Sequence, residues 1–304
     1  MKLFFSAGEP SGDLHGANLI AALKGRHAAL SAVGFGGSRM GSAGCRLLHD
    51  MSDLAVMGFG PALAKLPTFY RLKRQAERSF DEHRPDGVVL IDYPGFNWHL
   101  ARAAKRRGIP VIYYGLPQLW AWASWRVKKV RKYVDHALCK LPFEEAWFRG
   151  NDCNATYVGH PYFDELASQR LDEQLVASLR DRPGRVLTIL PGSRPQEVQN
   201  NLPMLLQAAA LVRRETPAVR VVVASYNKRQ AAMARQLVAS GPVPAEVFTS
   251  RTPELISAAD CCLATSGSVS LELLYHAKPA VIVDKVSWLA AQVVRRLVST
   301  RYIT

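Results

Sequence analysis

The sequence has few cysteines, and no two of them are spaced as in a zinc site or a redox motif. The five, Cys45, Cys139, Cys153, Cys261 and Cys262, are therefore expected to be reduced and mostly buried thiols. No run of about 18 uncharged apolar residues is present, which argues against a membrane-spanning helix. The opening MKLFF is too short for the apolar region of a signal peptide, so we expect a first buried strand of a cytoplasmic protein.

Three common ligand-binding motifs are also missing. The glycines at positions 8, 12 and 16 do not form the G-x-G-x-x-G dinucleotide fingerprint, and no G-x-x-x-x-G-K-[ST] phosphate loop is present. The chain also contains no D-x-D. These absences argue against hydride transfer, against P-loop hydrolysis and against a metal–diphosphate site built on two close aspartates.

Acidic residues are outnumbered by basic ones, 25 to 39, which gives a formal net charge of +14. Basic residues concentrate at 70–78, 102–108 and 125–133, all in the first half. Such a balance suggests an anionic membrane face, phosphorylated substrates or nucleic acid, although each cluster can also be a solvated helix face. Because no zinc finger, helix-turn-helix or aromatic stacking platform is visible, nucleic acid is not the expected partner.

Apolar, strand-like runs alternate with helical patterns in two series. Continuous Val, Ile and Leu strands separated by helices indicate parallel sheets with helices on both faces. The fold class expected is α/β, with two Rossmann-like domains facing a central cleft, over residues 1–163 and 164–304. The strand-like runs lie at 2–8, 32–37, 86–95, 109–115, 136–143 and 156–161, and then at 185–194, 219–227, 259–268 and 278–285.

Three strand ends carry small or polar residues, at 8–13, 191–194 and 266–270. Ligands of open α/β sheets bind outside the carboxyl ends of the strands. Gly192 allows close backbone approach, the Ser193 hydroxyl and the N–H groups of the next helix can donate to phosphate, and Arg194 adds a forked cationic donor. An ordinary turn with a surface arginine is the alternative.

The turn at Ser266, Gly267 and Ser268 is similar. Glu272 lies one helical turn beyond Ser268, so its carboxylate can accept hydrogen bonds from ribose hydroxyls or complement the helix dipole.

Asp92 follows the apolar run 87–91, and Pro94 and Gly95 then interrupt the strand. A carboxylate in this place can act as a general base, with Asn97 and His99 orienting it or the substrate. The alternative is an aspartate that caps the next helix.

Seven segments, taken together and in this order, resemble the lipid-A-disaccharide synthase family. They are AGEPSGD (7–13), LAVMG (54–58), IDYPGFN (91–97), PQLWAW (117–122), VGHP (158–161), LPGSRPQEV (190–198) and SGSVSLE (266–272).

The resemblance implies an inverting glycosyltransferase of the two-domain GT-B fold, with no metal or other cofactor. Its donor would be UDP-2,3-diacylglucosamine and its acceptor 2,3-diacylglucosamine 1-phosphate, giving a β-1,6-linked disaccharide 1-phosphate and UDP. The second domain would bind the donor and the first the acceptor.

The resemblance also implies roles for individual residues. Asp92 would take the proton of the attacking hydroxyl. The donor side would comprise Gly192, Ser193, Arg194, Glu197, Ser266, Gly267, Ser268 and Glu272. The acceptor side would comprise Gly8, Glu9, Ser11, Gly12, Asp13, Asn97, Gln118 and Trp120.

The apolar segment 54–70 and the basic stretch 71–78 are expected to seat the protein peripherally on the anionic inner face of the inner membrane. A core helix followed by a solvated one is the alternative. Pro61, Leu116 and Val269 depart from the family's usual residues, and the first two fall where acceptor contacts are expected. The chain stops at RRLVSTRYIT where the family continues, so the second domain is expected to be shortened.

Three other interpretations remain open from sequence. One is another UDP-sugar-using GT-B protein, such as an epimerase or a peptidoglycan glycosyltransferase, against which IDYPGFN and PQLWAW count. The others are an inactive sugar-nucleotide binder and a basic nucleic-acid-binding protein.

Overall fold

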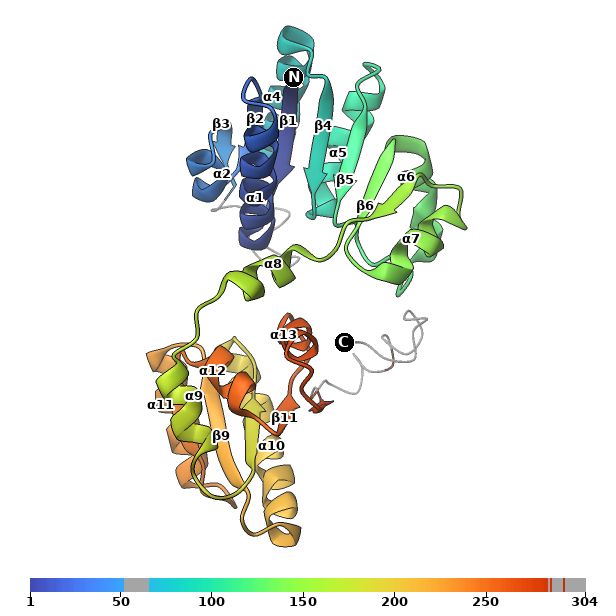
Figure 1. Ribbon diagram of the computed structural model, residues 1–304. Helices are drawn as coiled ribbons and strands as arrows, with labels where there is room; N and C mark the ends of the chain where they lie inside the picture. The colour runs from blue at the N-terminus through green and yellow to red at the C-terminus, as the bar shows by residue number, and fades with distance from the viewer. Residues whose placement is uncertain (52–65, 284, 286–291, 293–304) are drawn as a thin grey trace. The chain divides into compact units, whose positions relative to one another are not determined.

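The computed structural model describes residues 1–51, 66–283, 285 and 292. The chain folds into two compact units, and the division falls between Pro161 and Tyr162. We call them the N-unit and the C-unit (Figure 1).

The N-unit contains a seven-stranded sheet in which every pairing is parallel, with the order β3-β2-β1-β4-β5-β6-β7. Its strands are β1 (Lys2–Ala7), β2 (Ser31–Gly36), β3 (Cys45–Asp50), β4 (Gly87–Ile91), β5 (Val111–Tyr114), β6 (His136–Cys139) and β7 (Ala155–Tyr157).

Helices pack on both faces of this sheet. One face is covered by α1 (Pro10–Arg26) and α2 (Ser38–Ser42), whose Ile20 and Met40 join Phe5 and Ile91 in one core cluster. The other face is covered by α4 (Leu66–His83), α5 (Pro94–Lys105), α6 (Val127–Tyr133) and α7 (Pro142–Arg149), with a short 3₁₀ turn, η2 (Ser124–Arg126), before α6. Coverage on both sides explains why every residue of β4 is buried.

The C-unit repeats this plan with five parallel strands in the order β10-β9-β8-β11-β12. They are β8 (Val186–Leu190), β9 (Arg220–Ser225), β10 (Glu246–Thr249), β11 (Cys261–Ala264) and β12 (Ala280–Ile282).

Two core clusters occupy the two faces of this second sheet. Helices α9 (Glu173–Arg180), α12 (Thr252–Ala258) and α13 (Val269–Tyr275) contribute to one cluster, and α10 (Pro195–Glu215) and α11 (Lys228–Ala239) contribute to the other. Helix α8 (Pro161–Ser168) precedes α9. All five cysteines are free thiols, four of them buried, as expected.

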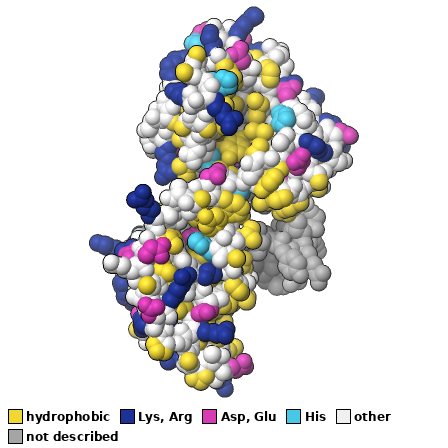
Figure 2. Space-filling view, in the orientation of Figure 1, with side chains coloured by type: hydrophobic (Ala, Val, Ile, Leu, Met, Phe, Trp, Pro, Cys, Tyr) yellow, Lys and Arg dark blue, Asp and Glu magenta, His cyan; other side chains and the backbone are white. Residues whose placement is uncertain are grey.

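The α/β class with two parallel sheets is confirmed. The sequence did not indicate β3 and β10, whose side chains are largely half-buried or exposed because each strand lies at a sheet edge. Such strands lack the continuous apolar run of a central strand. In the described ranges, no helix is long and apolar enough to cross a membrane. On the face shown in Figure 2, Lys and Arg side chains are dispersed over the surface of both units.

Candidate functional site

Each sheet has one point at which the chain changes direction along the strand order. In the N-unit this point lies between β1 and β4, and in the C-unit it lies between β8 and β11. Ligands of open parallel sheets bind outside the carboxyl ends of the strands at such points. The turns predicted from the sequence follow these four strands, at 8–13, 92–97, 191–194 and 266–268.

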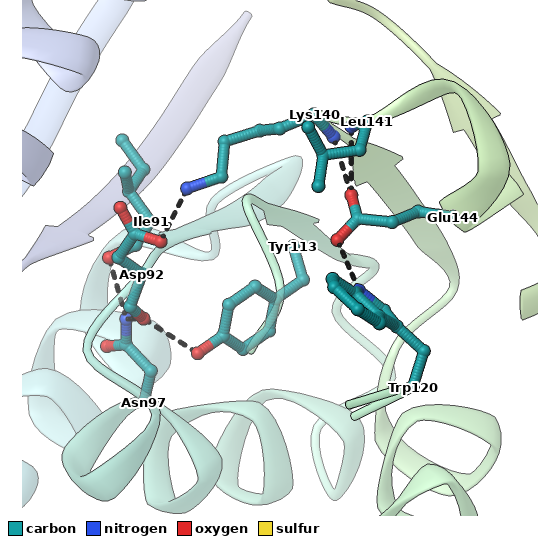
Figure 3. Close-up of polar contacts among 8 residues, drawn as sticks. All are labelled: Ile91, Asp92, Asn97, Tyr113, Trp120, Lys140, Leu141 and Glu144. Atoms are coloured by element: carbon teal, nitrogen blue, oxygen red, sulfur yellow. Dashed lines mark hydrogen bonds and ion pairs between the residues drawn. The ribbon is translucent and has the colours of Figure 1, made fainter. Parts of the chain in front are cut away.

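Asp92 directly follows β4 in a left-handed backbone conformation, with φ of 45°. Its carbonyl oxygen accepts hydrogen bonds from the Tyr113 hydroxyl at 2.7 Å and from Asn97 Nδ2 at 2.9 Å. The N-cap of α5 is Tyr93 and carries no side-chain cap bond, so Asp92 does not cap that helix. Instead its carboxylate Oδ1 lies 3.0 Å from Lys140 Nζ, as Figure 3 shows.

Asn97 supports this turn from inside the protein. The side chain is fully buried; it accepts from the Ser6 hydroxyl at 2.7 Å and donates to the carbonyl of Ile91 as well as that of Asp92. Because no surface of Asn97 reaches solvent, the structure gives it a place in the turn rather than the acceptor contact expected from the sequence.

The glycine turn after β1 packs against the same place. A Cβ added to Gly8 would lie 2.2 Å from the Tyr93 ring, so a side chain at this position displaces the ring. Gly12 faces Ala7 and Ile91 at ordinary contact distance. Asp13 is buried, and its carboxylate accepts from the backbone N–H groups of three residues around the start of α2, namely Gly37, Arg39 and Met40. Asp13 therefore anchors α2, whereas the sequence placed it on the acceptor side.

The remaining acceptor-side residues are accessible to different degrees. Glu9 and Ser11 are exposed overall, but partial desolvation of the Glu9 carboxyl, reinforced by the charge of Asp92, raises its pKa. Gln118 is exposed, whereas Trp120 is half-buried and donates through its indole Nε1 to Glu144 Oε1 at 3.0 Å. His99 lies exposed on α5.

Sequence reasoning missed three titratable residues around Asp92. Besides Lys140, they are His15 of α1 and His160, whose rings lie 6.4 Å apart in an edge-to-face arrangement. Burial lowers the pKa of His15, and it lowers that of His160 to about 4. The predicted strand-like run 136–143 contains Lys140, and only the observed end of β6 at Cys139 places Lys140 at the same sheet edge as Asp92.

The C-unit edge is hollowed into a cavity of about 720 Å³, a size typical of small-molecule sites. All eight residues predicted for the donor side line it: Gly192, Ser193, Arg194, Glu197, Ser266, Gly267, Ser268 and Glu272. The structure therefore brings together two turns that are more than 70 residues apart in the sequence.

The turn after β8 differs from the expectation in one respect. The Glu197 carboxylate accepts from the backbone N–H groups of Ser193 at 2.9 Å and Arg194 at 3.1 Å, and its other oxygen lies 3.2 Å from Arg194 Nη1. A Cβ at Gly192, where φ is 112°, would lie 2.5 Å from Glu197 Oε2. Two N–H groups that were expected to face a phosphate thus bind Glu197, which closes a capping box on α10. The Arg194 side chain remains 61% exposed.

Glu272 of α13 is the buried acid of the cavity, with 5% of its surface exposed. Its Oε2 accepts from the Tyr162 hydroxyl at 3.3 Å, while Oε1 is buried without a hydrogen-bond partner among the described residues. Burial raises the pKa of this carboxyl. An unpartnered buried acceptor is costly unless something donates to it, and this oxygen is free to accept a hydrogen bond within the described part of the chain.

Further cavity residues were not found from the sequence. Tyr226, which follows β9 and is 67% exposed, lines the cavity together with Gln169, Ser250 and Thr252. Tyr226 lay near the end of the predicted strand-like run 219–227, and this position was the available signal. Over residues 1–51, 66–283, 285 and 292, no cluster of three or more His, Cys, Asp or Glu side chains is arranged to hold a metal.

Comparisons with known proteins agree with this architecture. Solved structures with the same fold include the UDP-N-acetylglucosamine 2-epimerase from Neisseria meningitidis bound to UDP-GlcNAc, with a TM-score of 0.59 and 11% identity over 96% of this chain and 85% of that one. MurG from Acinetobacter baumannii matches with a TM-score of 0.55 and 11% identity over 97% of this chain and 88% of that one. At such identities the likeness shows the GT-B fold alone.

Sequence comparison is more specific. A family model described as lipid-A-disaccharide synthetase matches residues 3–304. A lipid-A-disaccharide synthase from Anaeromyxobacter sp. (strain K) is 35% identical over 99% of this chain and 79% of its own length. One from Burkholderia lata is 37% identical over 97% of this chain and 77% of its own length. The chain therefore belongs to the lipid-A-disaccharide synthase family, and it is a glycosyltransferase of lipid A biosynthesis that acts on lipid A precursors.

Proposed function

We propose that the chain transfers the sugar of UDP-2,3-diacylglucosamine to the 6-hydroxyl of 2,3-diacylglucosamine 1-phosphate. The C-unit cavity takes the nucleotide of the donor, and the carboxyl edge of the N-unit sheet takes the acceptor. The observation that carries the proposal is that eight donor-side residues, chosen from the sequence alone, line one cavity in a chain of this family.

Two residues of the cavity account for the main polar groups of a uridine diphosphate. Arg194 supplies a permanently charged fork for the diphosphate, and most of its side chain is exposed. Glu272 accepts from a ribose hydroxyl through its unpartnered Oε1. Tyr226, exposed beside them, offers a ring on which a uracil can stack. Glu197 shapes this site by holding the turn that presents Arg194.

Asp92 is the general base of the proposed reaction. The acceptor 6-oxygen attacks the anomeric carbon of the donor, its proton passes to the Asp92 carboxylate, and the bond from the anomeric carbon to the UDP oxygen breaks with its electron pair leaving on UDP. Attack opposite to the leaving group gives the inverted, β-linked product. The anomeric carbon passes through an oxocarbenium-like state, as in glycoside cleavage.

Negative charge grows on UDP as it departs. Arg194 can stabilise that charge in place, because its guanidinium is cationic at every physiological pH. The proposed reaction therefore proceeds without a metal or another cofactor.

The direct test measures UDP release from UDP-2,3-diacylglucosamine with and without the monosaccharide phosphate. The wild-type chain is expected to release UDP only when both are present. Asp92→Asn is expected to lower kcat about 10³-fold, within the range for a removed general base. Asp86→Asn is the matched control, since Asp86 lies at the amino end of β4 and accepts from Lys2 N. An Asp92→Asn variant with full activity would contradict the base assignment, and no UDP release by the wild type would contradict the substrates.

We further propose that the protein binds peripherally to the anionic inner face of the inner membrane. The predicted apolar segment 54–70 lies mostly outside the described residues, as does Pro61. Helix α4, which follows, packs Leu72 and Phe80 into the core and exposes Arg71, Arg74 and Arg78 on its other side, at helical spacing.

Co-sedimentation with anionic phospholipid vesicles tests this attachment. Replacing Arg71, Arg74 and Arg78 by Glu is expected to abolish most of the binding at physiological salt, because each basic residue near such a surface contributes about 1 kcal/mol. Replacing Lys228, Arg229 and Arg235 of the exposed side of α11 by Glu changes the net charge equally and serves as the control. Equal binding by the two variants would contradict the proposal.

A further inference from the structure

Lys140 is the cation that the structure pairs with Asp92. It directly follows β6, and its Nζ lies 3.0 Å from Asp92 Oδ1, with side-chain exposures of 19% and 25% for the two residues. The pair joins two strands that are not sheet neighbours, because β5 lies between β4 and β6. A contact of this kind depends on the backbone of both residues being fixed.

The backbone at Lys140 is held by a buried carboxylate. Glu144 of α7 is 4% exposed, and its Oε2 accepts from the backbone N–H groups of Lys140 and Leu141, both at 3.0 Å. The other oxygen, Oε1, accepts from the Trp120 indole at 3.0 Å (Figure 3). Both oxygens of Glu144 are thus engaged, and the Trp120 ring is packed edge-on against Phe143 with centroids 4.7 Å apart.

The backbone at Asp92 is held from the opposite side. Tyr113 and Asn97 both donate to its carbonyl oxygen, and burial raises the pKa of Tyr113, so that its hydroxyl stays protonated and remains a donor. The carboxylate and the ammonium are therefore each carried on a backbone that is held by hydrogen bonds from side chains.

We propose that Lys140 is the positioning residue of the catalytic base, held in place by the Glu144–Trp120 pair. Its ammonium holds Oδ1 of Asp92, which leaves Oδ2 for the acceptor hydroxyl. The inference rests on the proposed function, because it takes Asp92 as the base.

Several titratable groups surround Asp92, and they differ in their charge at neutral pH. Partial desolvation raises the pKa of Glu9; the charge of Asp92 raises it further, and the charge of Lys140 lowers it. His15 and His160 supply no positive charge at neutral pH, because burial lowers the pKa of both. The tyrosines Tyr113 and Tyr93 have pKa values raised by burial and are also uncharged. Among the residues that the structure describes, the cation paired with Asp92 is therefore Lys140.

The experiment compares pH profiles of kcat and kcat/KM for Lys140→Met and Lys140→Arg in the full chain. Lys140→Met is expected to lower kcat about 30-fold with little change in the KM of the donor. It is also expected to move the half-maximal pH on the acid side upward by about one unit, since a cation within 4–6 Å favours a carboxylate by about that much. Lys140→Arg keeps the charge and is expected to keep the acid limb in place while losing part of kcat.

Matched variants separate positioning from general damage. Lys2→Met makes the same substitution at an exposed lysine at the amino end of the sheet, and it is expected to behave as wild type. Trp120→Phe removes the indole donor to Glu144 and is expected to lower kcat about fivefold. Asp92→Asn combined with Lys140→Met is expected to be no slower than Asp92→Asn alone, because Lys140 acts through Asp92.

Two results would overturn the inference. One is a Lys140→Met variant whose acid limb is unmoved, and the other is a double variant in which the two losses multiply. If Lys140→Met does not fold, as judged by circular dichroism and UDP affinity, an acid limb displaced in Lys140→Arg would equally overturn it. These results can be told apart from a failure of the proposed function, because in that case Asp92→Asn itself would stay fully active.

Discussion

The two units share one architecture but differ in how the carboxyl edge of the sheet is filled. Both have a parallel sheet with one reversal of strand order, and in both the turns that carry candidate site residues follow the two strands at that reversal. In the N-unit the polar groups at this edge bind each other: Asn97 and Tyr113 hold the Asp92 carbonyl, and Lys140 holds its carboxylate.

In the C-unit the corresponding edge is a cavity. Glu272 keeps a buried oxygen without a described partner, and Arg194 extends a largely exposed guanidinium. Even so, the turn that carries Arg194 is as closely bound as its N-unit counterpart, because Glu197 occupies its N–H groups. One fold can therefore build either a rigid support for a single reactive group or a cavity for a ligand, depending on which polar groups find partners within the chain.

The largest expected effect concerns ligand binding in the C-unit cavity. Arg194→Ala is expected to raise the dissociation constant of UDP about 30-fold in calorimetry, because a hydrogen bond to a charged group contributes about 1.5–3 kcal/mol. Arg214→Ala is the control and should leave UDP binding unchanged, because Arg214 lies on the exposed side of α10, the helix that follows Arg194. Equal affinities in the two variants would remove Arg194 from the diphosphate site.

Much of this comparison could be predicted from the sequence, for a physical reason. Strands buried on both faces read as continuous apolar runs, and the turns after them carry local signals such as Gly192 and Pro94. The topology rule then places such turns at one edge. These rules point to seven of the eight cavity residues, and the family resemblance adds Glu197.

What the sequence could not supply depends on packing between distant elements. The partner of Asp92 is Lys140, 48 positions away and on a strand that is not its neighbour. The burial of Asn97 and Asp13 follows from how α5 and α1 pack on the sheet. The identity of a polar residue alone does not determine whether it hydrogen-bonds to solvent or to the backbone. The capture of the Ser193 N–H by Glu197 is likewise a choice between partners that only the folded turn decides.

The next effect concerns the rigid support. Gly8→Ala places a methyl group within 2.2 Å of the Tyr93 ring, and we expect a loss of about 2 kcal/mol in the free energy of unfolding, as for other overpacked sites. Gly25→Ala, in α1 with nothing within 4 Å of the added Cβ, is the control and should gain about 0.5–1 kcal/mol from helix propensity. Urea denaturation measures both changes. A Gly8→Ala variant as stable as the wild type would show that the N-unit edge adapts more readily than its contacts indicate.

A smaller effect is expected from changing Glu272 in the C-unit cavity, whose pKa is raised above 4.5 chiefly by burial. The contribution of such a carboxyl group to the stability of the fold is fully present below its ordinary pKa and is lost as the pH rises through its raised pKa. The ionised carboxylate of Glu272 therefore lowers the stability of the fold at neutral pH. Glu272→Gln is therefore expected to raise the melting temperature slightly while weakening UDP binding about tenfold.

The wild type gives the matching pH dependence. Its affinity for UDP is expected to fall as pH falls through the window above 4.5, because ligand hydroxyls donate to the ionised form. The Gln variant should show a flatter profile in the same calorimetric titrations. An unchanged affinity in Glu272→Gln, at any pH, would mean that the unpartnered oxygen does not receive a ligand hydroxyl.

The smallest effect returns to the N-unit. Burial lowers the pKa of His160 from 6.5 to about 4, so the folded state keeps it neutral where the unfolded chain is protonated. The contribution of the neutral His160 imidazole to the free energy of unfolding is fully present above pH 6.5 and is lost as the pH falls toward 4. His160 is only half-buried, so solvent screening limits the effect to about 1 kcal/mol between pH 7 and pH 5. His160→Gln should reduce the loss of unfolding free energy over that interval by this amount in urea titrations, whereas His27→Gln, at an exposed position after α1, should not. Identical losses in the two variants would show that the acid sensitivity of the support arises elsewhere, and the contrast with the C-unit would then rest on hydrogen bonding alone.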